Sequence, residues 1–136
     1  MINLTDSPIN IKEVIDSASA NGAGAVNVFI GTIRDTTNNK KVVQLEYEAY
    51  ESMAIAETKK IVDQASQRWE LLGYAISHRI GILKPGEVAV VVAVSTKHRK
   101  ESFEACQFII DSLKLSVPIF KKEIFEGGET WVGAQS

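Results

Sequence analysis

Residues 113–123 join a helix to a strand through a proline, and this junction constrains the fold more than any other part of the sequence. Apolar side chains at helical spacing lead up to Lys114. Pro118 cannot continue a helix, and it disfavours helical geometry at Val117. We therefore expect the helix to end just before the proline and an extended segment to follow it.

Three charged residues follow the proline in this extended segment. Because alternate side chains of a strand share a face, Lys121 and Glu123 should point one way and Lys122 the other. The bend would then direct Lys114 and Lys121 toward one pocket. There, repulsion and desolvation would lower the pKa of at least one ammonium group. The alternatives are lysines that protect a strand edge and a Lys121–Glu123 ion pair at the surface.

Composition places the chain among ordinary globular proteins. Its 136 residues fit one domain, 1–136, with 45% hydrophobic and 24% charged residues. A net charge of −2 gives no general attraction to nucleic acid or to a membrane. One cysteine excludes an internal disulfide, and with two histidines it cannot complete a structural zinc site. Without a signal segment or a long apolar run, the chain is expected to be cytoplasmic, without cofactor or metal.

The order of apolar patterns predicts the architecture. A helix capped by Asn10 should leave through a left-handed turn at residues 21–22. Residues 88–95 form a nearly continuous apolar run, which indicates a central strand buried on both faces. The pattern favours a two-layer α+β domain with helices packed against a mixed sheet. Its expected elements are strands at 25–34, 42–49, 74–80, 88–95, 119–126 and 129–132, helices at 50–70 and 99–116, a polar loop at 35–41 and a turn at 84–86.

Burial within these elements can be predicted from alternation and helical spacing. Residues 25–34 are β-branched and apolar, so we expect a buried strand that carries Arg34 at its end. Val43 and Leu45 should share the buried face of the next strand. Phe103 and Cys106 fall on the apolar stripe of the last helix, which makes Cys106 a buried, unreactive thiol.

Basic residues collect where the predicted elements end. They are Arg34, the His98-Arg99 pair, Lys114 and Lys121. The pair precedes a helix, whose free amides favour an anion such as phosphate or carboxylate. Taken singly, each residue fits a solvated surface charge, so the prediction of an anion site depends on the group. A second His-Arg dipeptide, at residues 78–79, is weak support for a metal site.

Several separated motifs resemble the large, catalytic subunit of molybdopterin synthase. They occur in the order expected for that family and extend from Gly22 to Val132. The motifs are FIGTIR at 29–34, LEYEAYESMA at 45–54, HRIG at 78–81, STKHR at 95–99, DSLK at 111–114, PIFKKE at 118–123 and Trp131-Val132.

This resemblance implies an α/β hammerhead fold and a heterotetramer. A homodimer of large subunits would form its centre, with one small ubiquitin-like sulfur-carrier subunit at each end. The small subunit's Gly-Gly tail, which ends in a thiocarboxylate, would insert into the large subunit. Sulfur would pass from two such tails to cyclic pyranopterin monophosphate and form the dithiolene of molybdopterin.

The resemblance also implies roles for single residues. The family's catalytic lysines fall on Lys114 and Lys121. Its substrate-binding positions fall on Thr32, Ile33, Arg34, His98, Arg99, Lys122 and Glu123. The chain departs from the family at Phe120, where tryptophan is expected, and in the 35–41 loop, which lacks an expected glycine.

A different class of function also fits the residues. A non-catalytic α+β module could bind an anionic ligand or a partner's tail in the same pocket, and it would bind without forming product. Nucleic-acid binding is disfavoured, because the sequence has no basic stripe with interleaved aromatic residues.

Overall fold

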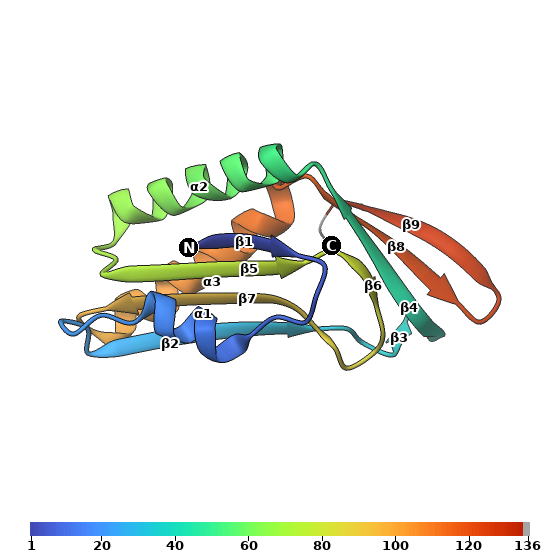
Figure 1. The fold of residues 1–136 in the computed structure, drawn as a ribbon, viewed down its shortest axis with the longest axis horizontal. Helices are drawn as coiled ribbons and strands as arrows, with labels where there is room; N and C mark the ends of the chain where they lie inside the picture. The colour runs from blue at the N-terminus through green and yellow to red at the C-terminus, as the bar shows by residue number, and fades with distance from the viewer. Residues whose placement is uncertain (135–136) are drawn as a thin grey trace.

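The protein has three helices and nine strands in residues 1–134, the part of the chain that the computed structural model describes; side chains are described for residues 1–128. One sheet has the order β1-β5-β7-β2, and the second has the order β3-β4-β8-β9, with β6 paired to β4. In Figure 1 the second sheet extends from one end of the first. The bounds are β1 Ile2–Thr5, α1 Ile11–Ala18, β2 Ala25–Thr32, β3 Thr36–Thr37, β4 Lys40–Ala49, α2 Glu51–Arg68, β5 Gly73–Arg79, β6 Gly81–Leu83, β7 Val88–Thr96, α3 Arg99–Ser116, β8 Ile119–Phe125 and β9 Gly128–Ala134.

The predicted central strand is confirmed. β7 lies between β5 and β2, and Val91 to Val94 have no exposed surface. One face of the sheet packs against α2 and α3, and the other packs against α1, as Figure 1 shows. Because β1 runs parallel to β5 while the other neighbours are antiparallel, the sheet is mixed, and the expected α+β class is confirmed.

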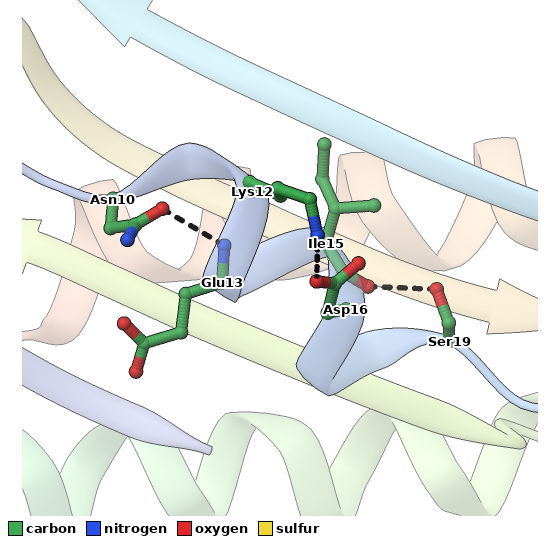
Figure 2. A network of polar contacts seen from close by, with 6 residues as sticks. All are labelled: Asn10, Lys12, Glu13, Ile15, Asp16 and Ser19. Carbon is green, nitrogen blue, oxygen red and sulfur yellow. Dashed lines mark hydrogen bonds and ion pairs between the residues drawn. The ribbon is translucent and has the colours of Figure 1, made fainter.

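The first helix begins as predicted but ends differently. Asn10 Oδ1 accepts a hydrogen bond from the Glu13 amide at 3.1 Å, the N-terminal cap visible in Figure 2. The helix ends at Ala18 because Ser19 is extended, and the Ser19 hydroxyl donates to the Ile15 carbonyl at 2.8 Å. The predicted left-handed exit at residues 21–22 is wrong, since neither residue has a positive φ.

Two predictions of burial are wrong for identifiable reasons. β2 is the last strand in its sheet, and α1 packs mainly on β5 and β7, so Val26 and Ile30 remain 43% and 42% exposed. In β4 a register shift between Val42 and Gln44 turns Val42 inward and leaves Val43 exposed. Leu45, beyond the shift, is buried as expected.

Residues 35–41, predicted as a polar loop, contain a tight hairpin. Thr36 and Thr37 pair with Lys41 and Lys40. The two turn residues, Asn38 and Asn39, have φ of 52° and 65°, the left-handed geometry of a type I′ turn. Asparagine tolerates this geometry, so the hairpin does not require the glycine that the sequence resemblance led us to expect.

The pattern missed two short strands, β1 and β6, and the exposure of Phe103 on α3. The other expected helices and strands are present within a few residues. Gly73, expected to end α2, instead begins β5. A Cβ there would lie 2.2 Å from the Ala18 carbonyl oxygen, so glycine permits the end of α1 to approach the sheet. No helix in the described part of the chain is long and apolar enough to cross a membrane.

Candidate functional site

The proline junction folds as its sequence predicts. α3 ends at Ser116, and Val117 is extended with φ −81° and ψ 130°. β8 then begins at Ile119, directly after Pro118. The last turn of α3 carries Lys114, so a helix and a strand present their lysines from either side of one bend.

A pocket of about 350 Å³ lies where the ends of β2 and α3 meet β4 and β8. Its apolar wall includes Phe29, Val42, Leu45 and Val90. Arg34 and Lys114 are exposed, whereas His78, Lys121 and Glu123 are buried, so charge extends from solvent into the interior. The polar and charged residues that line the pocket are Thr32, Arg34, Thr37, Tyr47, His78, Lys114, Lys121 and Glu123.

The strand alternation predicted for β8 is confirmed. Lys121 and Glu123 both face the pocket, with Lys121 Nζ 3.7 Å from Glu123 Oε1. Lys122 points away and pairs with Glu46 at 3.2 Å. Lys121 and Glu123 are only 7% and 3% exposed, so the alternative of a surface ion pair is wrong. Edge protection is wrong too, because β8 lies between β4 and β9.

The environment of Lys121 favours the neutral amine more than water does. Burial lowers the pKa of Lys121, and the positive charges of Arg34 and Lys114 lower it further, while Glu123 opposes the shift. Lys114 and Lys121 both line this pocket, which confirms the predicted convergence of the two side chains. The second oxygen of Glu123, Oε2, is buried without a hydrogen-bond partner among the described side chains.

Tyr47 and His78 form a wall of the pocket that sequence reasoning did not assign. Their rings meet edge to face, with centroids 5.1 Å apart. His78 Nδ1 lies 2.8 Å from the Arg79 carbonyl; because a carbonyl only accepts, Nδ1 carries the hydrogen in this bond. Burial lowers the pKa of His78 to about 4, so the ring is neutral at pH 7. Burial, and then the charge of Glu123, raise the pKa of Tyr47 to about 12.

The remaining predicted site residues divide between the pocket and other parts of the surface. Thr32 and Ile33 line the pocket. His98 and Arg99 are exposed at the start of α3. Arg99 precedes Lys114 by 15 residues of the helix, which corresponds to about 22 Å at the usual helical rise. Within one chain, His98, Arg99 and Lys122 do not line the pocket.

Two further predictions concern residues outside the pocket. Cys106 is buried, and burial raises the pKa of its thiol to about 11, in agreement with the predicted unreactive thiol. Phe120, where the family pattern leads us to expect tryptophan, packs edge to face against Tyr50 with ring centroids 5.9 Å apart, and it does not line the pocket.

Fold and site together define a class of protein: an α+β domain with a cationic pocket that contains a buried lysine and carboxylate. Such a pocket suits a compact anionic ligand, because guanidinium and ammonium groups near its mouth can bind phosphate or carboxylate.

Comparisons with known proteins identify the family within this class. The family model described as MoaE protein matches residues 4–116. The molybdopterin synthase catalytic subunit of Bacillus subtilis is 48% identical over 132 residues, which cover 97% of this chain and 84% of that protein. The human protein of the same name is 41% identical over 133 residues. The match covers 98% of this chain and 71% of the human protein. The chain belongs to the MoaE family of molybdopterin synthase catalytic subunits.

A solved structure agrees with this assignment. The crystal structure of molybdopterin synthase from Staphylococcus aureus has a TM-score of 0.92 and 38% sequence identity, and the match covers 96% of this chain and 95% of that one. The family is therefore one of enzymes of molybdopterin biosynthesis, and the expected resemblance is confirmed.

Proposed function

We propose that this chain transfers sulfur from the thiocarboxylated C-terminus of a small ubiquitin-like subunit to cyclic pyranopterin monophosphate, as the catalytic subunit of molybdopterin synthase. The observation that carries the proposal is the convergence of Lys114 and Lys121, from α3 and β8, with Arg34 in one pocket. We place the reaction in the cytoplasm, where the sequence predicts this chain to work.

The charges of the pocket suit both reactants. Arg34 and Lys114, exposed near the mouth, can bind the substrate's phosphate. The partner's tail is an acyl group, and a buried ammonium can stabilise the negative charge that develops when its thiocarboxylate reacts. We assign this role to Lys121, which is buried in the pocket with its ammonium group 3.7 Å from Glu123.

Proton transfer is a second task for the buried lysine. Because burial lowers the pKa of Lys121, this side chain gives up and regains a proton more readily near neutral pH than a solvated lysine does. The sulfur comes from the partner's tail, so no cysteine of this chain has to react. The burial of Cys106 agrees with that division of work.

His98 and Arg99 retain their proposed role in substrate binding only if a second copy of the chain supplies them. Within one chain they lie at the far end of α3 from Lys114. In a homodimer at the centre of a heterotetramer, the start of one copy's α3 can approach the pocket of the other. Lys122, for which the resemblance implies substrate binding, points away from the pocket toward Glu46, so we propose that it contacts the partner subunit instead.

One mixed assay tests the proposal. Purified protein, a thiocarboxylated small subunit and cyclic pyranopterin monophosphate are combined, and both the product and the mass of the partner's tail are measured. We expect molybdopterin to form while the tail loses sulfur. Binding of the substrate and the tail without product would favour the non-catalytic module, and it would contradict the proposed activity.

A further inference from the structure

The dipeptide His78-Arg79, which has no role in the proposed chemistry, ends β5 beside the pocket. Arg79 does not line the pocket itself. Its guanidinium Nη1 lies 2.5 Å from Glu87 Oε2, and the side chain is only 15% exposed. The Glu87 side chain is 39% exposed, so the pair lies at the boundary of the interior, and the burial of Arg79 leaves it less screened than the ion pairs between two exposed side chains.

Glu87 belongs to the turn that leads into β7. Its amide donates to the Lys84 carbonyl at 3.1 Å, and Gly86 takes a positive φ of 89°, a geometry that suits glycine. Through its side chain, Glu87 therefore connects this turn to the end of β5.

The same turn holds the residue that precedes Arg34. The Ile33 amide donates to the Glu87 carbonyl at 3.0 Å, and the Gly86 amide donates to the Ile33 carbonyl at 2.8 Å. The turn thus holds both the amide and the carbonyl of Ile33, and the Ile33 side chain is buried, with 5% of it exposed. Arg34 follows immediately, and its side chain is exposed near the mouth of the pocket.

Arg79 also contacts the pocket wall at His78 through its main chain. Its carbonyl accepts the hydrogen bond from His78 Nδ1, which orients the His78 ring against Tyr47. One residue thus fixes two parts of the wall: His78 through its carbonyl, and the backbone at Ile33 through its ion pair with Glu87.

We infer that Arg79 and Glu87 form a positioning pair that sets the place of Arg34 and, through it, the affinity of the pocket for its anionic substrate. This inference rests on the proposed function, since the substrate used to test it is cyclic pyranopterin monophosphate. Neither residue touches the substrate in this scheme. Loss of the pair releases the turn, and the backbone before Arg34 moves with it.

The test compares Arg79→Gln, Glu87→Gln and Arg79→Lys with wild type. A small displacement of a binding group can reduce its contribution by an order of magnitude, so we expect KM for the pterin substrate to rise about ten-fold in the two Gln variants. We expect kcat to change by less than about three-fold, because Lys114 and Lys121 stay on α3 and β8. Arg79→Lys keeps the charge and should recover part of the loss.

A second measurement is independent of activity. Hydrogen exchange of the Ile33 amide should accelerate about ten-fold in Glu87→Gln, while the amide of Val92 in the central strand should keep its wild-type rate. The matched control is Lys12→Gln, which removes an ion pair of 2.7 Å between exposed residues of α1. It should change neither KM nor the exchange at Ile33.

The outcomes separate this inference from the proposed function. An unchanged exchange rate at Ile33 in folded Glu87→Gln overturns the positioning pair whatever the activity of the wild type. Faster exchange with an unchanged KM also overturns it, because the turn would then not control the pocket. A wild type that forms no product contradicts the proposed function. In that case, calorimetry measures binding of the pterin substrate to wild type and to the Gln variants. Weaker binding by the variants supports the positioning pair, and equal affinity overturns it.

Discussion

Tyr47 and Lys121 lie directly opposite each other on the antiparallel strands β4 and β8, and both side chains line the pocket. The ring of Tyr47 is therefore a cross-strand neighbour of the buried lysine. Burial and the charge of Glu123 raise the pKa of its hydroxyl from 10 to about 12, so the tyrosine adds no negative charge beside the lysine even in mildly alkaline solution. Glu123, which also lines the pocket, supplies a carboxylate 3.7 Å from the Lys121 ammonium.

Replacing Lys121 should abolish sulfur transfer. We expect Lys121→Ala to reduce kcat by about 100-fold or more, because it removes a group that stabilises developing charge in a buried site. The measurement is the rate of product formation with a thiocarboxylated partner. Lys60→Ala, which removes an exposed ion pair on α2, is the control and should keep the wild-type rate. Full activity of Lys121→Ala would refute the assigned role.

The pKa of Lys121 should respond in opposite directions to its two charged neighbours. Lys114→Gln removes a positive charge that lowers this pKa, so the titration should move up; Glu123→Gln removes a charge that raises it, so the titration should move down. NMR titration of selectively labelled lysine side chains measures both shifts. In wild type, the titration should lie below 10.5, the ordinary lysine value. Shifts in the same direction for both variants would contradict the proposed arrangement.

The burial of Lys121 also predicts how stability depends on pH. Its pKa is lower in the folded state than in the unfolded state, so the cost of burying the charge is fully present below the folded pKa. That cost disappears as the pH rises toward 10.5. Lys121→Met, which retains the apolar stem, should lack this alkaline gain in the free energy of unfolding. Chemical denaturation at a series of pH values provides the measurement, and parallel curves for the two proteins would count against the prediction.

His78 should make the protein sensitive to acid. Its folded pKa of about 4 lies below the ordinary value of 6.5, so stability is fully present above pH 6.5 and is lost as the pH falls toward 4. The shift corresponds to a loss of about 3 kcal/mol at most. His78→Phe keeps an aromatic ring against Tyr47 but cannot titrate. Its free energy of unfolding should fall less steeply between pH 6.5 and 4, and an equal slope would exclude His78 as the cause.

A mixture of two inactive variants should regain activity if His98 and Arg99 serve the pocket of a second copy. In a dimer that combines Lys121→Ala with Arg99→Ala, one site carries both changes and the other carries neither. With random mixing of a twofold dimer, about a quarter of all sites are then intact. The assay follows product formation after the variants are unfolded and refolded together. Activity no greater than that of the single variants would place Arg99 elsewhere.

Much of this site could be predicted because local rules determine it. Pro118 ends the helix, and strand alternation separates Lys121 and Glu123 from Lys122 whatever the rest of the chain does. The contribution of His78 could not be predicted, because it depends on how the end of β5, in one sheet, meets β4 in the other. Its position within its own strand was predictable, but the approach of Tyr47 was not.

The wrong predictions of burial also arise from contacts between strands. The pattern of β2 indicates an apolar strand, yet only the strand order shows that β2 is an edge, which leaves Ile30 in solvent. The register shift in β4 reverses the alternation of buried and exposed side chains at Val43, and no residue type in that stretch indicates the shift. Burial therefore follows from neighbours that a single strand's sequence does not specify.

The short strand β1 has a consequence for the time course of folding. Its residue Ile2 pairs with Ile76, so the ends of a long intervening chain must meet before this parallel pair can form. Loop closure of that length is costly in entropy, and non-local pairs of this kind form slowly. We expect β5 and β7 to associate first and β1 to dock late. Because none of the residues that line the pocket comes from β1, the site can be assembled before the sheet is complete.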